Sequence, residues 1–324
     1  MLRGLALLVV AALLPGPVSA QAAPDYRVVH GWPQLPEGLA LGAVAGVGVD
    51  SKGLVWVFQR AGRQWTDPLP SDPIAAPTVV AFDGETGKIA NAWGDGRFVM
   101  PHGLSVDAQD NIWLTDVALH QVFKFSPEGK LLLSLGEAGV PGTDGKHFNR
   151  PTDIAVLPDG SFYVSDGYIN SRVAKFAPDG RFLFEWGVRG TATGAFDLPH
   201  GLAVDAQGRV YVADRENDRI QRFDGRGKFL DAWKSPEMGR PYGIALLPGG
   251  MAAVIDGGEQ PKRGRDRSAV AILRPDGSVA ARFGRYGNYD GQFQQGHDIA
   301  ADARGNLFVV DIGGERVQKF ERIR

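Results

Sequence analysis

The chain has 324 residues, with 35 Lys and Arg against 37 Asp and Glu, which gives a formal net charge of −2. A weakly acidic chain of this kind is a poor partner for nucleic acid, which basic surfaces bind. The absence of cysteine excludes a thiol nucleophile, a thiolate metal site and disulfide bonds, and 44 Gly with 21 Pro favour a large all-β domain of short strands and many turns.

The N-terminal segment has the pattern of a cleavable export signal. One Arg stands near its start, an apolar run extends from Leu5 to Leu14, and small residues end it at Ala20. The run is shorter than the about 20 residues that a membrane-spanning helix needs, and no later segment is long and apolar enough. We therefore expect residues 1–20 to be a signal peptide, residues 21–324 to form one domain without a membrane span, and the protein to be periplasmic or secreted. The alternative is an uncleaved membrane anchor.

After the leader, the first predicted element is a strand over residues 26–32, and six copies of a hairpin unit follow it. Each copy has a short β-branched strand, a polar Gly or Asn turn and an alternating second strand, which is typical of a β-hairpin. The second strands end at intervals of 42 to 57 residues, at Gln59, Asp116, Asp166, Asp214, Asp256 and Asp311. Repeats of this length with several strands per unit indicate a β-propeller.

A third strand with apolar residues at alternate positions follows in each unit, as in residues 121–125 and 219–223. A Pro-Asp-Gly or similar turn then leads to a fourth strand, of which residues 181–187 are a clear example. The sixth unit ends at Arg324 without a fourth strand. We therefore predict an all-β, six-bladed propeller in which the strand at residues 26–32 pairs onto the last blade and closes the ring.

Three histidines open the first strands of alternate units: His102 in the second, His200 in the fourth and His297 in the sixth. In a six-membered ring these positions lie about 120° apart around the central axis. Neutral imidazole suits Zn²⁺, and three protein ligands leave one position open for water or substrate, as in catalytic zinc sites. The odd units carry Ala, Thr and Tyr in this register. The alternative is that Pro-His-Gly serves turn geometry alone.

Residues just past the second strands return to the face of the propeller that carries the histidines. The sequence places Arg60, Tyr168 and Arg215 there, in the first, third and fourth units. Guanidinium groups hold carboxylates with forked donors, and cationic neighbours lower the pKa of a tyrosine and make it a better base. The cluster is therefore predicted to bind an anion and to handle a proton. Taken singly, each residue could instead be a loop ion pair or a packed ring.

These residues lie in stretches that resemble the peptidyl-α-hydroxyglycine α-amidating lyase family, whose members are six-bladed propellers of NHL-type repeats. The similarity covers nearly the whole chain after the leader, and the most specific stretches are Pro101–Leu104, Thr115–Lys124, Arg150–Asp153, Val164–Arg172, Ala213–Asn217 and His297–Asp298. The sequence departs from the family's Met-Pro before the third histidine, where it has Gln295-Gly296.

The resemblance implies a set of site residues. Zn²⁺ would be held by the three histidines, Tyr168 would be the base on the substrate hydroxyl, and Arg60 and Arg215 would be the active-site arginines. A structural Ca²⁺ in the channel would be bound by the carbonyl groups of Val47 and Leu104 and by the carboxylate of Asp298. Oxygen ligands from three blades suit Ca²⁺.

The reaction that the resemblance implies is cleavage of the C–N bond of a peptidyl- or acyl-α-hydroxyglycine to a primary amide and glyoxylate. Zinc would bind the α-hydroxyl group, Tyr168 would accept its proton, and Arg60 would hold the carboxylate. The expected partner is thus a peptide or small-molecule substrate with a C-terminal α-hydroxyglycine. We also expect a monomer, and no copper hydroxylase domain in this chain to make the substrate.

Two other functions remain alternatives. One is a non-catalytic exported NHL-type propeller that binds peptide, glycan or protein, which predicts no stoichiometric zinc and tolerance of Tyr168→Phe. The other is a calcium-dependent propeller hydrolase such as a lactonase, which needs a carboxylate-rich metal site, whereas the residues in register here are histidines. The sequence has no His-Glu-x-x-His, Gly-x-Ser-x-Gly or phosphate-loop pattern, so other common hydrolase and nucleotide-binding interpretations have no support.

Overall fold

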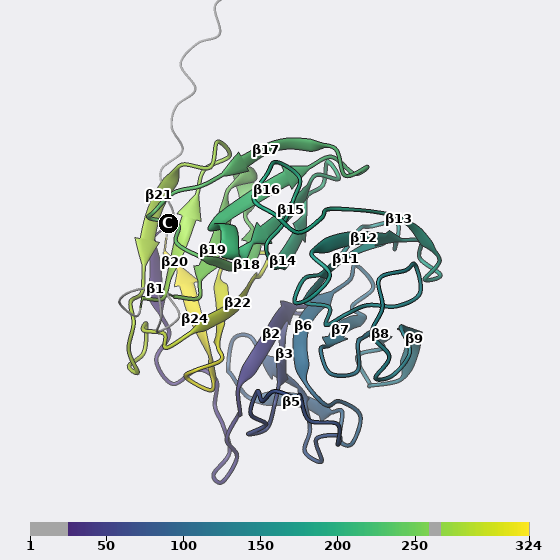
Figure 1. The fold of residues 1–324 in the computed structure, drawn as a ribbon. Helices are drawn as coiled ribbons and strands as arrows, with labels where there is room; N and C mark the ends of the chain where they lie inside the picture. Colours follow the sequence, from purple (N-terminus) through teal and green to yellow (C-terminus); the bar gives the residue numbers. More distant parts are fainter. Residues whose placement is uncertain (1–24, 259–266, 324) are drawn as a thin grey trace, which may run out of the picture.

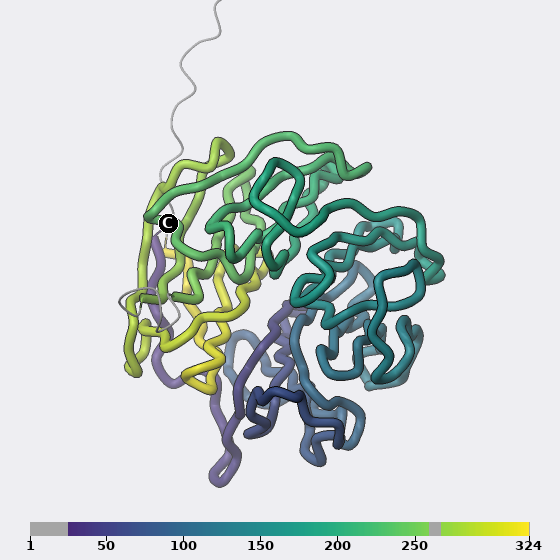
Figure 2. The backbone as a smooth tube through the Cα atoms, in the orientation of Figure 1, coloured from purple at the N-terminus to yellow at the C-terminus, as the bar shows by residue number. Residues whose placement is uncertain are grey.

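The computed structural model describes residues 25–258 and 267–323, which form six four-stranded antiparallel sheets arranged as blades around a central channel (Figure 1). The predicted all-β, six-bladed propeller is confirmed. Figure 2 traces the chain around the ring, from the purple first blade to the yellow last one. The predicted signal peptide, residues 1–20, lies outside the described residues. In the described ranges, no helix has the length and apolar character needed to cross a membrane.

The first three blades each take four consecutive strands, beginning with the one nearest the channel. Blade one contains β2 (Val44–Val49), β3 (Leu54–Gln59), β4 (Val79–Asp83) and β5 (Ile89–Trp93). Blade two contains β6 (Pro101–Val106), β7 (Ile112–Asp116), β8 (Gln121–Phe125) and β9 (Leu131–Leu135). Blade three contains β10 (Asp153–Val156), β11 (Phe162–Asp166), β12 (Arg172–Phe176) and β13 (Phe182–Trp186).

Blades four and five follow the same plan, and each includes one short 3₁₀ helix. Blade four contains β14 (Pro199–Val204), β15 (Val210–Asp214), η1 (Arg215–Asn217), β16 (Arg219–Phe223) and β17 (Phe229–Trp233). Blade five contains β18 (Pro241–Leu246), η2 (Pro248–Gly250), β19 (Ala252–Asp256), β20 (Ala269–Leu273) and β21 (Val279–Phe283). Blade six contains β22 (Gly296–Ala301), β23 (Leu307–Asp311), β24 (Arg316–Arg322) and β1 (Tyr26–Val28).

The second strand of each blade is almost entirely buried, because neighbouring blades cover both of its faces. In β7 all five residues are buried, whereas the outer strand β13 alternates between half-buried and exposed positions. Apolar side chains fill the space between blades: Trp56 and Phe58 of blade one pack in one cluster with Leu104 and Leu114 of blade two. Burial of this kind is the main favourable contribution to folding, and it holds each blade against the next.

Strand β1 comes from the opposite end of the chain to the rest of its sheet. It pairs antiparallel with β24, with Tyr26 opposite Arg322 and Val28 opposite Phe320. The strand is shorter than the predicted residues 26–32, because the chain turns away after Val29. Trp32 nevertheless returns to the core, where its ring lies 5.1 Å from that of Phe308 in β23.

Candidate functional site

In blades two to six, a buried aspartate at the end of the second strand binds neighbouring segments of the blade on one face of the propeller, and Gln59 takes this position in blade one. Asp116 accepts hydrogen bonds from the backbone N–H of Val99, before the first strand, and of Ala118, after the second. In blade six, Asp311 accepts a hydrogen bond from the backbone N–H of Gln295 in the same way. The start of the first strand and the exit of the second therefore meet at the same mouth of the channel.

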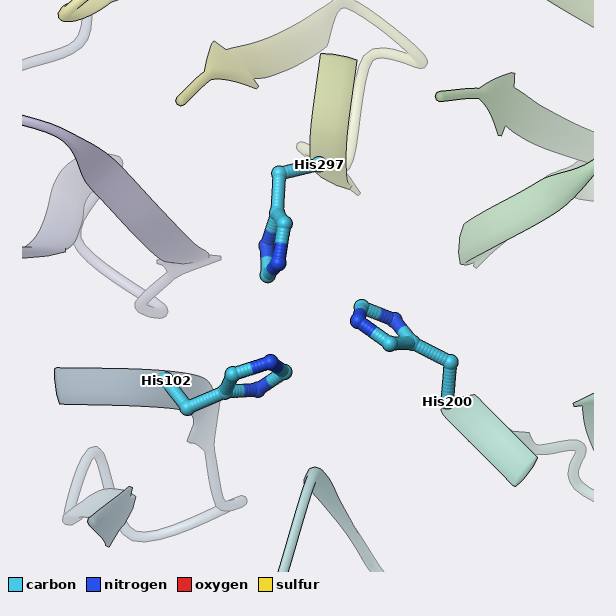
Figure 3. A group of neighbouring side chains, drawn as sticks. All are labelled: His102, His200 and His297. Atoms are coloured by element: carbon cyan, nitrogen blue, oxygen red, sulfur yellow. The ribbon is translucent and has the colours of Figure 1, made fainter. Parts of the chain in front are cut away.

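At this mouth, His102, His200 and His297 project from β6, β14 and β22 toward the channel axis (Figure 3). All three side chains are buried. Their ring centroids lie 4.8 to 4.9 Å apart, and one ring nitrogen of each lies within 4.8 Å of the others. Three imidazoles from alternate blades thus converge on one point, as the spacing of the repeats predicts.

The second ring nitrogen of each histidine contacts a backbone carbonyl of the following blade. These Nδ1 to oxygen pairs are His102 with Thr152 (2.7 Å), His200 with Tyr242 (2.8 Å) and His297 with Ala45 (2.6 Å). A carbonyl oxygen only accepts, so Nδ1 carries the hydrogen and the lone pair of Nε2 faces the other histidines. In the part of the chain that the structure describes, Nε2 of His200 is buried without a hydrogen-bond partner.

Burial keeps the three imidazoles neutral. It lowers the pKa of His297 to about 3 and the pKa values of His102 and His200 well below their usual range. Repulsion from the neighbouring histidines and from Arg60 and Arg215 adds to this lowering. Neutral imidazole is the form that binds a metal, and three such ligands with an open fourth position can hold a divalent ion.

Beside the histidines lies a cavity of about 570 Å³. Its lining includes His297 and the three other residues predicted from the hairpin geometry, Arg60, Tyr168 and Arg215. Both arginines are buried, and the Tyr168 hydroxyl lies 2.9 Å from Nε2 of His102. The structure thus brings all six predicted residues of this face together.

The two arginines lower the pKa of Tyr168, as predicted, but they do not set the direction of the net shift. Burial raises the pKa of Tyr168, and this outweighs the lowering by Arg215 and Arg60. Burial also lowers the pKa of Arg60 to about 10. The sequence of a short loop does not indicate how deeply its side chains are buried. It therefore predicts the effect of the two arginines on the pKa of Tyr168 and not the effect of burial.

Two aromatic residues of the site escaped the sequence analysis as functional candidates. The Tyr242 ring lies tilted against that of His200, with 4.9 Å between centroids, and the Arg215 guanidinium lies 4.7 Å from the Tyr242 ring centroid. The sequence does contain a signal for Tyr242, because this residue occupies the position in blade five that histidine occupies in the even blades. Trp65 lies in the loop between β3 and β4, with its ring 5.0 Å from that of Tyr168. No periodic pattern marks this loop.

Further along the channel, two carboxylates, the buried Asp153 and the half-buried Asp298, project from blades three and six, on opposite sides of the ring. Asp298 accepts a hydrogen bond from the Val47 N–H, and Asp153 accepts one from the Leu202 N–H. Burial raises the pKa of Asp153 to about 7 and raises the pKa of Asp298 well above its usual range, with repulsion from Asp153 adding to the second effect. Val47 and Leu104 line the same cavity as both carboxylates. The family resemblance implies Asp298 at this position, and no signal in the sequence indicated Asp153.

Comparison with known proteins places the chain in a family. The NHL repeat model matches residues 98–125, 148–176 and 196–223. The chain is 36% identical to a probable peptidyl-α-hydroxyglycine α-amidating lyase of Caenorhabditis elegans, over 86% of this chain and 82% of that protein. It is 37% identical to peptidyl-glycine α-amidating monooxygenase B of Xenopus laevis over 89% of this chain, and it spans 35% of the length of that protein.

Solved structures support the fold alone. A gluconolactonase of Xanthomonas campestris superposes with a TM-score of 0.64 at 18% identity, covering 92% of this chain and 90% of that one. The family itself rests on the closer sequence similarity to the lyase, which extends over most of both chains. The chain therefore belongs to the peptidyl-α-hydroxyglycine α-amidating lyase family.

Proposed function

We propose that this protein is a zinc-dependent lyase that cleaves the C–N bond of a peptidyl- or acyl-α-hydroxyglycine to a primary amide and glyoxylate. One observation carries the proposal: three neutral histidines converge on a single point beside the Tyr168 hydroxyl and two buried arginines. The names of the relatives, which describe amidating lyases, agree with this chemistry.

The histidine cluster suits Zn²⁺. Each Nδ1 is engaged by a carbonyl, each imidazole is neutral, and the buried Nε2 of His200 lacks a partner within the described residues. A metal ion removes the cost of leaving such a nitrogen unpaired. When bound, Zn²⁺ would supply Lewis acidity to the hydroxyl group of the substrate.

Arg60 is the residue best placed for the substrate carboxylate. Its Nε donates a hydrogen bond to the carbonyl of Pro101 at 2.9 Å, which fixes the guanidinium. Among the described residues, its Nη2 is buried and has no hydrogen-bond partner. A buried donor without a partner is costly, and a carboxylate in the adjoining cavity would satisfy it.

Arg215 has a different role, because neighbouring side chains already contact its guanidinium group. Its Nε donates to Glu216 at 3.0 Å, and its guanidinium lies near the rings of both Tyr168 and Tyr242. From there it lowers the pKa of Tyr168 and stabilises the phenolate form. Tyr168 then accepts the hydroxyl proton of the substrate.

The electron flow follows from that proton transfer. The O–H electrons become the second C–O bond of glyoxylate, and the C–N pair departs with the amide nitrogen. The proton that Tyr168 accepted can pass to this nitrogen and complete the primary amide. Base and acid are then one group, and Tyr168 returns to its starting state.

Three further features belong to this proposal. A structural Ca²⁺ would be held in the channel by Asp298 with the carbonyls of Val47 and Leu104, where a cation would relieve the repulsion between Asp298 and Asp153. The leader pattern of residues 1–20 supports export to the periplasm or the medium. The catalytic unit would be the single chain, because all six residues of the face belong to it.

Glyoxylate release tests the proposal. We expect zinc-loaded protein to release glyoxylate from an N-acyl-α-hydroxyglycine faster than buffer does, and His200→Ala to lose both the zinc and the activity. His30→Gln is the matched control, since the His30 side chain is 76% exposed and pairs with Asp290 away from the channel. Release at the buffer rate by zinc-loaded wild type would overturn the proposal.

A further inference from the structure

The two sides of the cavity differ in chemistry. Arg60 lies over blade two, where it contacts Pro101, and Tyr168 follows the second strand of blade three. Tyr242 is the second residue of the first strand of blade five, and Gln295 immediately precedes the first strand of blade six. Blades five and six lie opposite blades two and three in a six-membered ring. One side thus offers the Arg60 guanidinium and a base, and the other a phenol and a carboxamide. The Arg215 guanidinium of blade four lies between them, 5.6 Å from the ring centroid of Tyr168 and 4.7 Å from that of Tyr242.

This division orients the substrate, given the function proposed above. The carbinolamide carbon carries a hydroxyl group, a carboxylate, an acylamino group and a hydrogen atom. With the hydroxyl group at the histidines and the carboxylate on Arg60, the acylamino group extends toward blades five and six. The group that leaves as the amide therefore faces Tyr242 and Gln295, which both line the cavity.

Hydrogen bonds on both sides fix the backbone of Gln295 at the cavity. Its backbone N–H donates to Asp311 at 2.8 Å, and its carbonyl accepts from the N–H of Ile312 at 3.0 Å. It stands two residues before His297, so its side chain begins beside the histidine cluster. Nε2 lies 3.4 Å from the Tyr242 hydroxyl, at the limit of a hydrogen bond. Within residues 25–258 and 267–323, its Oε1 accepts no hydrogen bond from the protein.

Tyr242 complements this carboxamide. Its hydroxyl oxygen accepts from Arg240 Nη1 at 3.1 Å, which leaves the hydroxyl hydrogen free to be donated. A substrate amide presents one N–H and one carbonyl. The acceptor of Gln295 and the donor of Tyr242 match these two groups, whereas the Met of the family pattern at position 295 would offer no comparable acceptor.

We propose that Gln295 and Tyr242 form the subsite for the amide group of the substrate, with Gln295 Oε1 accepting the amide N–H and the Tyr242 hydroxyl donating to the acyl carbonyl. The inference rests on the proposed lyase function, because that function orients the substrate. It makes Gln295 a specificity-determining residue that discriminates an amide from an ester linkage.

Two unreactive analogues test this directly. N-benzoylglycine and O-benzoylglycolate share the carboxylate and the acyl group, lack the hydroxyl group, and differ only in N–H against O. We expect zinc-loaded wild type to bind the amide about 10-fold more tightly than the ester by calorimetry, which corresponds to one hydrogen bond of about 1.4 kcal/mol. Gln295→Met should bind both alike, and Gln295→Glu, which keeps an acceptor, should retain the preference.

Gln294→Met is the matched control, because the Gln294 side chain donates to Asn288 at 2.6 Å and does not line the cavity. It should behave as wild type. Zinc content and the melting temperature establish that each variant is folded. An undiminished preference in Gln295→Met, or none in wild type, would overturn the subsite. Neither result depends on turnover, so failure of the lyase function is read separately, from glyoxylate release.

Discussion

The hydroxyl group of Tyr168 lies 2.9 Å from Nε2 of His102. A metal ion held by the histidines would be bound by that same nitrogen, so the phenol stands beside whatever molecule takes the open coordination position. No other side chain intervenes between the two atoms. The contact joins the candidate base directly to the candidate metal centre.

Removal of this hydroxyl group should abolish most of the activity without loss of the metal. Tyr168→Phe keeps the ring contact with Trp65 and the guanidinium contact with Arg215, and loses only the group that accepts the proton. We expect kcat for glyoxylate release to fall by about 10²–10⁴, the usual contribution of general acid–base catalysis. Tyr163→Phe is the control, because it removes a hydroxyl group of blade three that donates a hydrogen bond to the Gly225 carbonyl of blade four. A loss below threefold in Tyr168→Phe would contradict the assigned role.

The buried histidines should make the metal-free protein sensitive to acid. The pKa of His297 is about 3 in the folded state, against about 6.5 in an unfolded chain. Below pH 6.5 the unfolded chain therefore binds a proton that the folded protein does not, and stability falls by about 1.4 kcal/mol per pH unit for this group until pH 3.

A difference measurement isolates this histidine, because the buried carboxylates are common to both proteins. We expect the unfolding free energy of metal-free wild type, from urea titrations at pH 7, 6 and 5, to fall relative to that of His297→Gln as the pH is lowered. His30→Gln changes an exposed histidine, so its unfolding free energy should fall in parallel with that of wild type as the pH is lowered. Parallel curves for wild type and His297→Gln would count against a neutral buried imidazole.

Calcium should stabilise the protein through the channel carboxylates. Addition of Ca²⁺ to chelator-treated wild type should raise the melting temperature, since a ligand that binds only the folded state shifts the unfolding equilibrium. Asp298→Asn removes the charge but keeps an acceptor for the Val47 N–H, and it should lose most of the calcium response. Mg²⁺, which demands a smaller octahedral site, serves as the ionic control. An equal calcium response in Asp298→Asn would place the ion elsewhere.

The pairing of β1 with β24 should contribute strongly to stability. A chain beginning at Pro33 lacks β1 and also Trp32, which is buried against Phe308. We expect its unfolding free energy in urea to be at least about 3–5 kcal/mol below that of a chain beginning at Asp25, since loss of a buried Trp alone costs that much. Trp32→Ala in the longer chain separates the side chain from the strand. Equal stabilities would show that the ring does not depend on this strand.

Most of the fold could be predicted from sequence, because the alternation of apolar and polar residues in strands and the turn residues between them are local signals. Each of the six repeats carries these signals again. The register of His102, His200 and His297 followed once the repeats were aligned, since strand position alone sets which residues face the axis. Arg60 and Tyr168 followed from the course of a hairpin, which returns to the face where it began.

The remainder depends on how distant segments approach one another. Trp65 reaches Tyr168 from a loop of blade one whose course is held by the Arg63 to Asp72 ion pair, and no repeat pattern contains that information. The direction of the Tyr168 pKa shift depends on burial, which is a property of the assembled ring. Asp153 faces Asp298 only in the assembled ring, where blades three and six lie opposite each other, and no local sequence pattern contains that pairing.

The hydrogen bonds behind the histidines link the candidate metal centre to the other three blades. Blades two, four and six carry the imidazoles, and the carbonyls that orient them belong to Thr152, Tyr242 and Ala45 of blades three, five and one. A propeller otherwise gains its cohesion from contacts between adjacent blades only. One ion on the axis would connect all six at once, so the loaded ring should unfold as a single cooperative unit, while the empty ring can open between any two neighbours.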